Sequence, residues 1–171
     1  MIRGKYLSSM DDISPVLSLR AAMLSPEDPE ATRDVHDEMC FYALALDDDG
    51  NPKGTGRLYL DEDARFRLGT ICVLPEARGN GLGDLIARML LFRALDLNAA
   101  SVRAVCPVNA VGFLLRYGMH PVGEVLFCHG TACRMMEAAA EEINLEGSCH
   151  RNGRCNGCSA EDCANCPSEA K

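Results

Sequence analysis

One segment, residues 70–97, constrains the fold of this 171-residue chain more than any other. It begins with an apolar stretch that predicts a β-strand and continues through a loop containing Gly79, Gly81 and Gly83. Apolar residues then recur at i, i+3, i+4, i+7 and i+8, as on one face of an α-helix: Leu82, Leu85, Ile86, Met89 and Leu90. The segment therefore predicts a strand, a glycine-rich turn and a long amphipathic helix.

The glycine-rich loop has the physical properties of an anion site. Backbone N–H groups at a helix start have no helical partners, and the helix dipole places partial positive charge there. Glycine allows positive φ and lets a ligand approach the backbone closely. Residues 78–83, Arg-Gly-Asn-Gly-Leu-Gly, therefore favour a pyrophosphate cradle. A P-loop would need Gly-Lys-Ser/Thr, which is absent, and a dinucleotide fingerprint would need a glycine where Asp84 stands.

The remaining pattern predicts an α+β domain of residues 1–146, with a mixed sheet and helices on both of its faces. Strands are expected at residues 2–7, 39–46, 54–60, 66–74, 101–106, 122–128 and 131–136. Besides the long helix, shorter helices are expected after the capping residues Asp11 and Asp12 and at residues 30–37, 109–117 and 138–145.

Charge and hydropathy exclude several classes of protein. The chain has 17 basic and 25 acidic residues, a formal charge of −8. An acidic chain repels phosphate backbones, so we expect no nucleic-acid partner. The longest apolar run, residues 39–46, is far shorter than the roughly 20 residues that span a bilayer, and no signal peptide is indicated. The sequence therefore predicts a cytoplasmic protein without a membrane partner.

Half of the ten cysteines crowd into residues 147–171, a segment without Val, Ile, Leu, Met, Phe, Trp or Tyr. This Cys-rich tail cannot form a hydrophobic core, so it is either disordered or held by something other than burial, such as a metal. Disulfides are a third option, which the expected cytoplasmic location and the odd number of tail cysteines disfavour. Two Cys-x-x-Cys pairs supply four thiolates, enough for tetrahedral zinc: Cys155, Cys158, Cys163 and Cys166. Their spacing also shares part of an iron–sulfur pattern. The five earlier cysteines are expected to be small buried hydrophobes.

A second motif follows the long helix and one further strand. Residues 107–119 contain Asn109, Phe113 and Gly118 at the start, middle and end of an expected short helix. With the loop, this segment resembles the GNAT superfamily of acetyl-CoA-dependent N-acyltransferases. That family has a Val-x-Pro-x-x-Arg-Gly-x-Gly-x-Gly motif, matched by residues 73–83, and an Asn before a helix with Phe-Tyr-x-x-x-Gly-Phe. The resemblance extends over roughly residues 2–137.

The resemblance implies a three-layer α/β/α fold with a mostly antiparallel, splayed central sheet. The strands at residues 66–74 and 101–106 would part at their ends and admit the pantetheine arm of acetyl-CoA. Backbone groups would pair with that arm at Ile71, Cys72 and Val73. Asn109 would contact the cofactor on the far side. Amides holding the pyrophosphate would come from Arg78, Gly79, Asn80, Gly81, Leu82 and Gly83.

The activity implied by the resemblance is acetyl transfer from acetyl-CoA to a primary amine of a small molecule or peptide, by direct attack in a ternary complex. A lysine-like amine is neutral in only about one molecule in 2,500 at pH 7, so a general base or a desolvated amine site would help. No base is identified, because the histidines His36, His120 and His129 are isolated in the sequence.

The sequence departs from the family at the usual acid. Leu114 stands where the family has a tyrosine, and Tyr117, about one helical turn on, is the predicted proton donor to the thiolate. Coenzyme A thiolate can also leave without help. The alternative is a non-catalytic acyl-CoA-binding module coupled to a metal- or redox-sensing tail. Acidic turns at residues 47–49 and 61–63 hint at a cationic acceptor, and the oligomeric state is not indicated.

Overall fold

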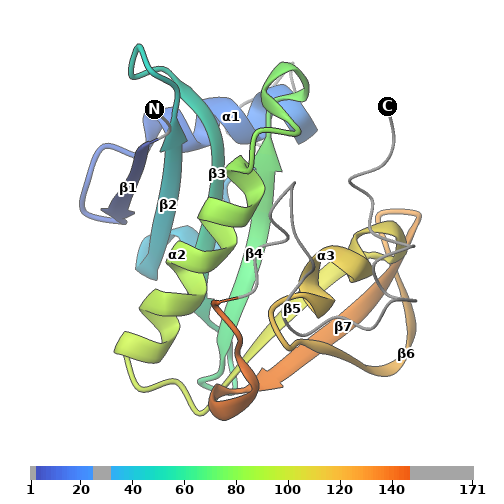
Figure 1. Ribbon diagram of the computed structural model, residues 1–171. Coiled ribbons are helices and arrows are strands. Elements are labelled where there is room, and N and C mark those ends of the chain that lie inside the picture. The colour runs from blue at the N-terminus through green and yellow to red at the C-terminus, as the bar shows by residue number, and fades with distance from the viewer. Residues whose placement is uncertain (1–2, 25–31, 147–171) are drawn as a thin grey trace.

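The computed structural model describes residues 3–24 and 32–146, which form one seven-stranded sheet with helices on both faces (Figure 1). Its strands are β1 (Arg3–Ser8), β2 (Cys40–Leu46), β3 (Pro52–Leu60), β4 (Phe66–Val73), β5 (Ser101–Pro107), β6 (His120–Cys128) and β7 (Thr131–Ala139). Its helices are α1 (Ser14–Leu24), α2 (Leu82–Asp96) and α3 (Val111–Leu115), with 3₁₀ turns η2 (Val35–Met39), η3 (Pro75–Ala77), η4 (Val108–Ala110) and η5 (Ala140–Glu142).

The strand order in the sheet is β1-β2-β3-β4-β5-β7-β6. All neighbouring strands are antiparallel except β4 and β5, which run parallel because α2 connects them. Helix α1 lies on one face of the sheet, and α2 and α3 lie on the other (Figure 1). The predicted α+β class, with a mixed and mostly antiparallel sheet, is therefore confirmed.

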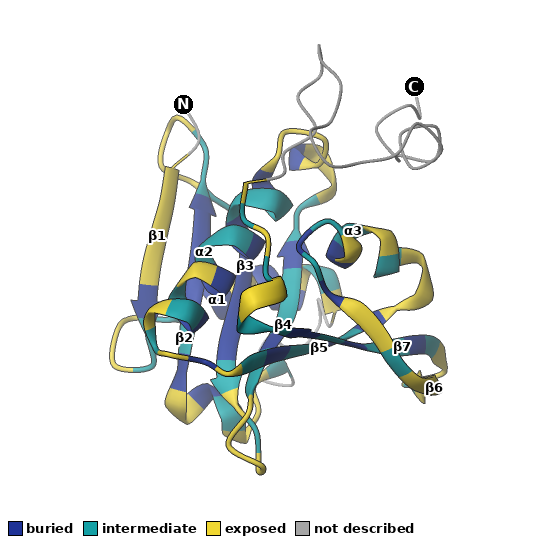
Figure 2. Cartoon of the chain, turned by 60° about the horizontal axis from the view of Figure 1, so that its bottom comes forward, coloured by how far each residue is buried: buried dark blue, intermediate teal, exposed yellow. Residues whose placement is uncertain are grey.

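Helix α2 packs very closely on the middle of the sheet because β3 carries glycines beneath it. A Cβ atom placed on Gly56 would lie only 2.7 Å from Cγ2 of Ile86 and 3.0 Å from Cδ1 of Leu90. Both of those helix residues are fully buried, and they join the apolar residues of β2 to β5 in the main core. Figure 2 shows this centre in dark blue, whereas β6 at the sheet edge is largely yellow and exposed.

Three expected helices differ from the structure. The helix expected at residues 138–145 is wrong, because Ala138 and Ala139 continue β7 and pair with β5, and only η5 follows. The helix expected at residues 109–117 is shorter, split into η4 and α3, and the chain turns at Gly118 with φ of 81°. Of the helix expected at residues 30–37, residues 30 and 31 lie outside the described residues, and the remainder forms the 3₁₀ turn η2 at Val35–Met39.

The Cys-rich tail, with Cys155, Cys158, Cys163 and Cys166, lies outside the described residues. Of the five earlier cysteines, Cys128 is partly exposed and four are buried, as expected for small hydrophobes: Cys40, Cys72, Cys106 and Cys133. Within residues 3–24 and 32–146, none of the helices has the length and apolar character needed to cross a membrane.

Candidate functional site

The parallel strands β4 and β5 pair over only three residues each and then separate. Phe66 to Leu68 of β4 pair with Val102 to Ala104 of β5, and the register ends there. Beyond that point β4 still pairs with β3, and β5 still pairs with β7. Each strand therefore turns one unpaired backbone edge toward the opening, which is the splay that the sequence resemblance implied. Ile71, Cys72 and Val73 lie on the β4 side of this opening.

A β-bulge in β4 marks the place where the strands part. Between the pairs Arg57–Gly69 and Thr55–Cys72, β4 has two residues where β3 has only one. The extra residue is accommodated at Thr70, whose φ is 51°. A positive φ is strained for a β-branched residue, and such strain is concentrated at functional sites. The bulge frees the backbone of β4 from its regular ladder beside the opening.

The loop between η3 and α2 has the conformation predicted for an anion cradle. Gly79 and Gly81 have φ of 78° and 77°, and a Cβ atom on either would meet no atom within 4 Å. Gly81 is the N-cap of α2 and supplies no side-chain cap. The first helical hydrogen bond runs from Leu85 N–H to the Gly81 carbonyl at 2.9 Å, so the preceding amides lack helical partners. The loop thus offers open space above uncapped N–H groups.

Side chains of the loop stabilise its shape. Arg78 donates from Nε to the Val73 carbonyl at 3.2 Å, while Asn80 donates from Nδ2 to the Ala77 carbonyl at 3.3 Å. Leu82 is buried in the core, so only its backbone can contact a ligand. Gly83 packs against α3, because a Cβ there would lie 3.7 Å from the Phe113 ring.

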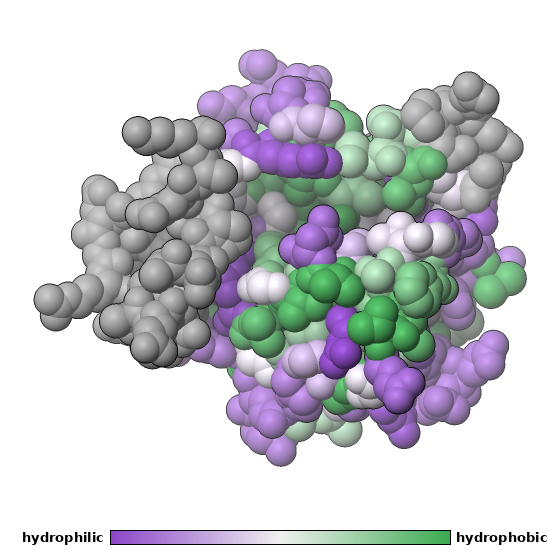
Figure 3. All heavy atoms as spheres, turned by 90° about the vertical axis from the view of Figure 1, so that its right-hand side faces the viewer, coloured by the Kyte–Doolittle hydropathy of each residue, from purple (hydrophilic) through white to green (hydrophobic). Residues whose placement is uncertain are grey.

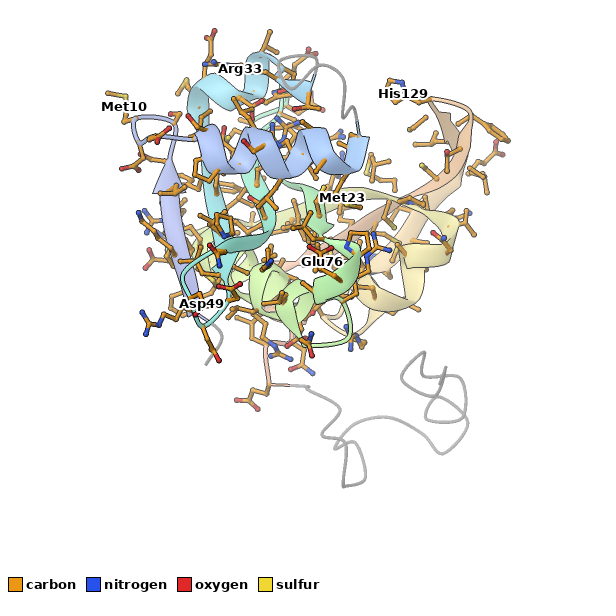
Figure 4. All side chains as sticks on the ribbon, turned by 90° about the horizontal axis from the view of Figure 1, so that it is seen from above. Met10, Met23, Arg33, Asp49, Glu76 and His129 are labelled. Carbon is orange, nitrogen blue, oxygen red and sulfur yellow. The ribbon has the colours of Figure 1, made fainter. Side chains whose placement is uncertain are left out.

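The remaining predicted cofactor contact lies across the opening. Asn109 is exposed in η4, which directly follows the end of β5. The structure therefore places the β4 backbone, the loop and Asn109 around the mouth of the β4–β5 opening. Figure 4 looks down on this end of the molecule, with Glu76 of η3 near its centre.

Tyr117, the predicted acid, is fully buried, and its hydroxyl donates to Oδ1 of Asp84 at 2.7 Å. Arg88 donates to the other oxygen of that carboxylate, also at 2.7 Å. Burial raises the pKa of Asp84, but the hydrogen bonds from Arg88 and Tyr117 outweigh it and hold that pKa below its usual range. Burial and the Asp84 carboxylate together raise the pKa of Tyr117. This geometry favours a structural role for Tyr117, and its role as proton donor stays a prediction.

On the α1 side of the sheet, the structure brings together two residues that the sequence did not connect. The rings of His36 in η2 and Tyr59 in β3 stack with centroids 4.3 Å apart. The Tyr59 ring also lies against Gly69, where a Cβ would be 3.3 Å from it. This aromatic pair therefore stands beside the bulge. Twenty-two residues separate the two in the chain, so no local pattern could have revealed the contact.

Comparisons with known proteins give a family match for the sequence and a shared fold for the structure. The sequence pattern of the Acetyltransferase (GNAT) family matches residues 12–119. An acyl-CoA N-acyltransferase from Pseudomonas aeruginosa superposes with a TM-score of 0.70 at 21% identity, covering 81% of this chain and 100% of that one. ElaA from Escherichia coli gives 0.68 at 20% identity, covering 80% and 99%. The NatC complex bound to Gag peptide and CoA gives 0.64 at 16% identity, covering 81% and 98%.

Proposed function

The chain belongs to the Acetyltransferase (GNAT) family, and from this premise we propose that it transfers an acetyl group from acetyl-CoA to a primary amine. The acceptor is a small molecule or a peptide, and both substrates are bound together when the amine attacks. One observation carries the proposal: the open edge of β4 leads directly to the uncapped, glycine-rich start of α2. That combination suits a cofactor with a peptide-like arm and a pyrophosphate.

The loop supports the pyrophosphate end of this proposal. Amides between Arg78 and Gly83 would hold the phosphates, helped by the positive end of the α2 dipole. The nearby carboxylate of Asp84 would repel them if it stood alone, but Arg88 balances its charge. Asn109 would contact the cofactor from the β5 side.

The β4 edge supports the acyl end. In the stretch Ile71, Cys72 and Val73, the backbone N–H and C=O groups that face the opening, on alternate residues, would pair with the pantetheine arm as an added strand would. An N–H of Cys72 or Val73 would also donate to the oxyanion of the tetrahedral intermediate. Burial raises the pKa of the Cys72 thiol, which disfavours the nucleophilic thiolate form.

The chemical step is a direct transfer. The lone pair of the neutral amine attacks the thioester carbonyl carbon, and a C–N bond forms. The C–S bond then breaks, coenzyme A leaves as the thiolate, and the extra proton on nitrogen passes to solvent or to a base. The thiolate is a fair leaving group, so an acid at Tyr117 is not essential to the proposal. The family match does not favour the alternative of a non-catalytic acyl-CoA-binding module.

A thiol-release assay tests the proposed function. The full chain is mixed with acetyl-CoA and a panel of primary amines, and free thiol is followed together with the mass of the amine. We expect release that depends on the amine, with an equal amount of product heavier by one acetyl group. Acetyl-CoA binding without release from any amine would instead support the non-catalytic module.

A further inference from the structure

Strands β5, β7 and β6 form the half of the sheet that a described helix covers only on the α2 side. Helix α1 packs against β3 and β4, whereas α3 packs against β6 and β7 from the side of α2. In the described part of the chain, no comparable contact joins α1 to β5, β7 or β6. Among residues 3–24 and 32–146, no helix therefore covers the α1 side of these three strands as α1 covers β3 and β4.

The strand register shows which side chains this face carries. Val105 of β5 is paired with Met135 of β7, which is paired in turn with Val122 of β6. Each of them is partly exposed, and Leu126 further along β6 is 41% exposed. We call these four residues the open face. Figure 3 looks at the side of the molecule formed by β6 and β7 and shows green, apolar atoms gathered there.

Two ion pairs lie on the same side of the sheet as the open face. Arg103 of β5 and Glu137 of β7 lie opposite one another and form an ion pair of 3.0 Å. Arg67 of β4 forms another with Asp61 at 2.9 Å. Both pairs lie at the end where β4 and β5 are still joined. The open face itself is therefore apolar, with compensated charges along one border.

The open face begins where the two strands part. Val105 is the first residue of β5 beyond the parallel pairing, and Gly69 is the first of β4. Tyr59, stacked on His36, covers the Gly69 side. Seen from above, the β6–β7 hairpin extends to the same side of the sheet as α1, with His129 at its tip (Figure 4). Apolar and aromatic side chains thus flank the point at which the proposed transfer takes place.

We propose that the acceptor is a primary amine on an apolar body, aliphatic or aromatic, which lies on the open face while its nitrogen reaches the bulge. This inference rests on the proposed function. Burial of the apolar body provides binding free energy in proportion to its area. An apolar surround also lowers the pKa of an ammonium group, which increases the fraction of neutral nucleophile without a dedicated base. A polyamine would instead have to place its further charges against these apolar side chains.

The acidic turns that hinted at a cationic acceptor have a structural role in the fold. Asp47 accepts hydrogen bonds from the backbone N–H groups of Asp49 and Asn51. Asp61 likewise accepts from its own turn and from Arg67. These two carboxylates therefore shape their own turns.

The test compares two kinds of amine on the full chain. Hexylamine and 2-phenylethylamine are set against 1,4-diaminobutane and spermidine in the thiol-release assay. We expect kcat/KM to be at least about 10-fold higher for the apolar amines, since each buried methylene favours binding. Met135→Glu, which places a charge on the open face, should remove that preference while the Kd of acetyl-CoA stays unchanged.

Phe92→Glu is the matched control, because Phe92 is an apolar residue of α2 that is 59% exposed and lies away from the open face. It should keep the wild-type preference. A wild type that prefers polyamines, or a preference that survives Met135→Glu, would overturn the inference and leave the proposed function standing. A wild type that releases no thiol with any amine would contradict both. Acetyl-CoA binding reports that each variant is folded.

Discussion

At the residue scale, Asp84 is the least expected feature of the site. A carboxylate in the first turn of a helix is favourable for the helix dipole but unfavourable beside a bound pyrophosphate. The structure resolves this conflict by giving each oxygen of Asp84 its own donor, Tyr117 or Arg88. The carboxylate then contributes to the start of α2, and its charge is balanced locally. The structure therefore favours a role for Tyr117 in orienting the Asp84 carboxylate.

Tyr117→Phe separates this structural role from the predicted acid role. The substitution removes only the hydroxyl, so the buried ring keeps its packing. We expect kcat and the KM for acetyl-CoA to change less than about threefold, and the free energy of unfolding to fall by about 1.5–3 kcal/mol, as for a lost hydrogen bond to a charged group. A fall in kcat of about 10- to 100-fold at constant KM would instead establish Tyr117 as the proton donor.

At the element scale, a buried ion network joins α1, η2 and β3. Asp37 in η2 accepts hydrogen bonds from both terminal nitrogens of Arg20 in α1, at 2.8 and 2.9 Å, and from Arg57 in β3 at 3.0 Å. Tyr42 of β2 donates to the same carboxylate at 2.9 Å. This network fixes η2, and with it His36, against the sheet. Its partners come from four separate elements, so the sequence alone gave no sign of it.

Asp37→Asn tests this network through its pH dependence. Burial raises the pKa of Asp37, but hydrogen bonds from Arg20 and from the Asp34 backbone outweigh it and hold the pKa far below the usual range. The carboxylate therefore stabilises the fold fully above the unfolded pKa of about 3.9, and that contribution is lost as the pH falls toward the folded value. We expect Asp37→Asn to lower the free energy of unfolding by about 3–5 kcal/mol near neutral pH.

Urea unfolding of both proteins near pH 7 and near pH 3 provides the measurement, with Asp96→Asn as the control. Asp96 pairs with Arg93 on the exposed surface of α2, so its replacement should have little effect. The difference in free energy of unfolding between the wild type and Asp37→Asn should be smaller near pH 3 than near pH 7. A difference that is the same at both pH values would show that the Asp37 charge does not support the fold.

The elements differ in how well the sequence could predict them. The strand, loop and start of α2 were predictable because hydrophobic spacing and glycine requirements are local properties. The end of β7 could not be predicted in this way. Ala138 and Ala139 are good helix formers, and they become part of a strand only because they pair with β5. The bulge at Thr70 was also hidden, since its cause is the register between β3 and β4. The stack of His36 on Tyr59 depends on tertiary contact in the same way.

At the scale of the whole molecule, the two halves of the sheet play different parts. Strands β1 to β4 lie between α1 and α2 and form a rigid support that positions the loop and the bulge. Strands β5 to β7 separate from β4 and have Asn109 at their border. In the part of the chain that the structure describes, no helix packs on their α1-side face as α1 packs on β3 and β4. The opening between the halves would receive the arm of acetyl-CoA, and the open face would receive the acceptor. In this proposal, the two substrates would approach the bulge at Thr70 from different sides of the sheet.

The central claim is that the glycine-rich start of α2 holds acetyl-CoA, and calorimetric titration of the Gly81→Val variant tests it most directly. Gly50→Val is the control, since Gly50 in the β2–β3 turn has a similar φ of 85° and equally open surroundings. Both substitutions introduce the same backbone strain, but only the first places a side chain where the pyrophosphate must approach. We expect Gly81→Val to weaken acetyl-CoA binding at least about 10-fold, or about 1.4 kcal/mol, and Gly50→Val to bind as the wild type does. Equal affinity in the wild type and in a folded Gly81→Val protein would contradict the assignment of the site.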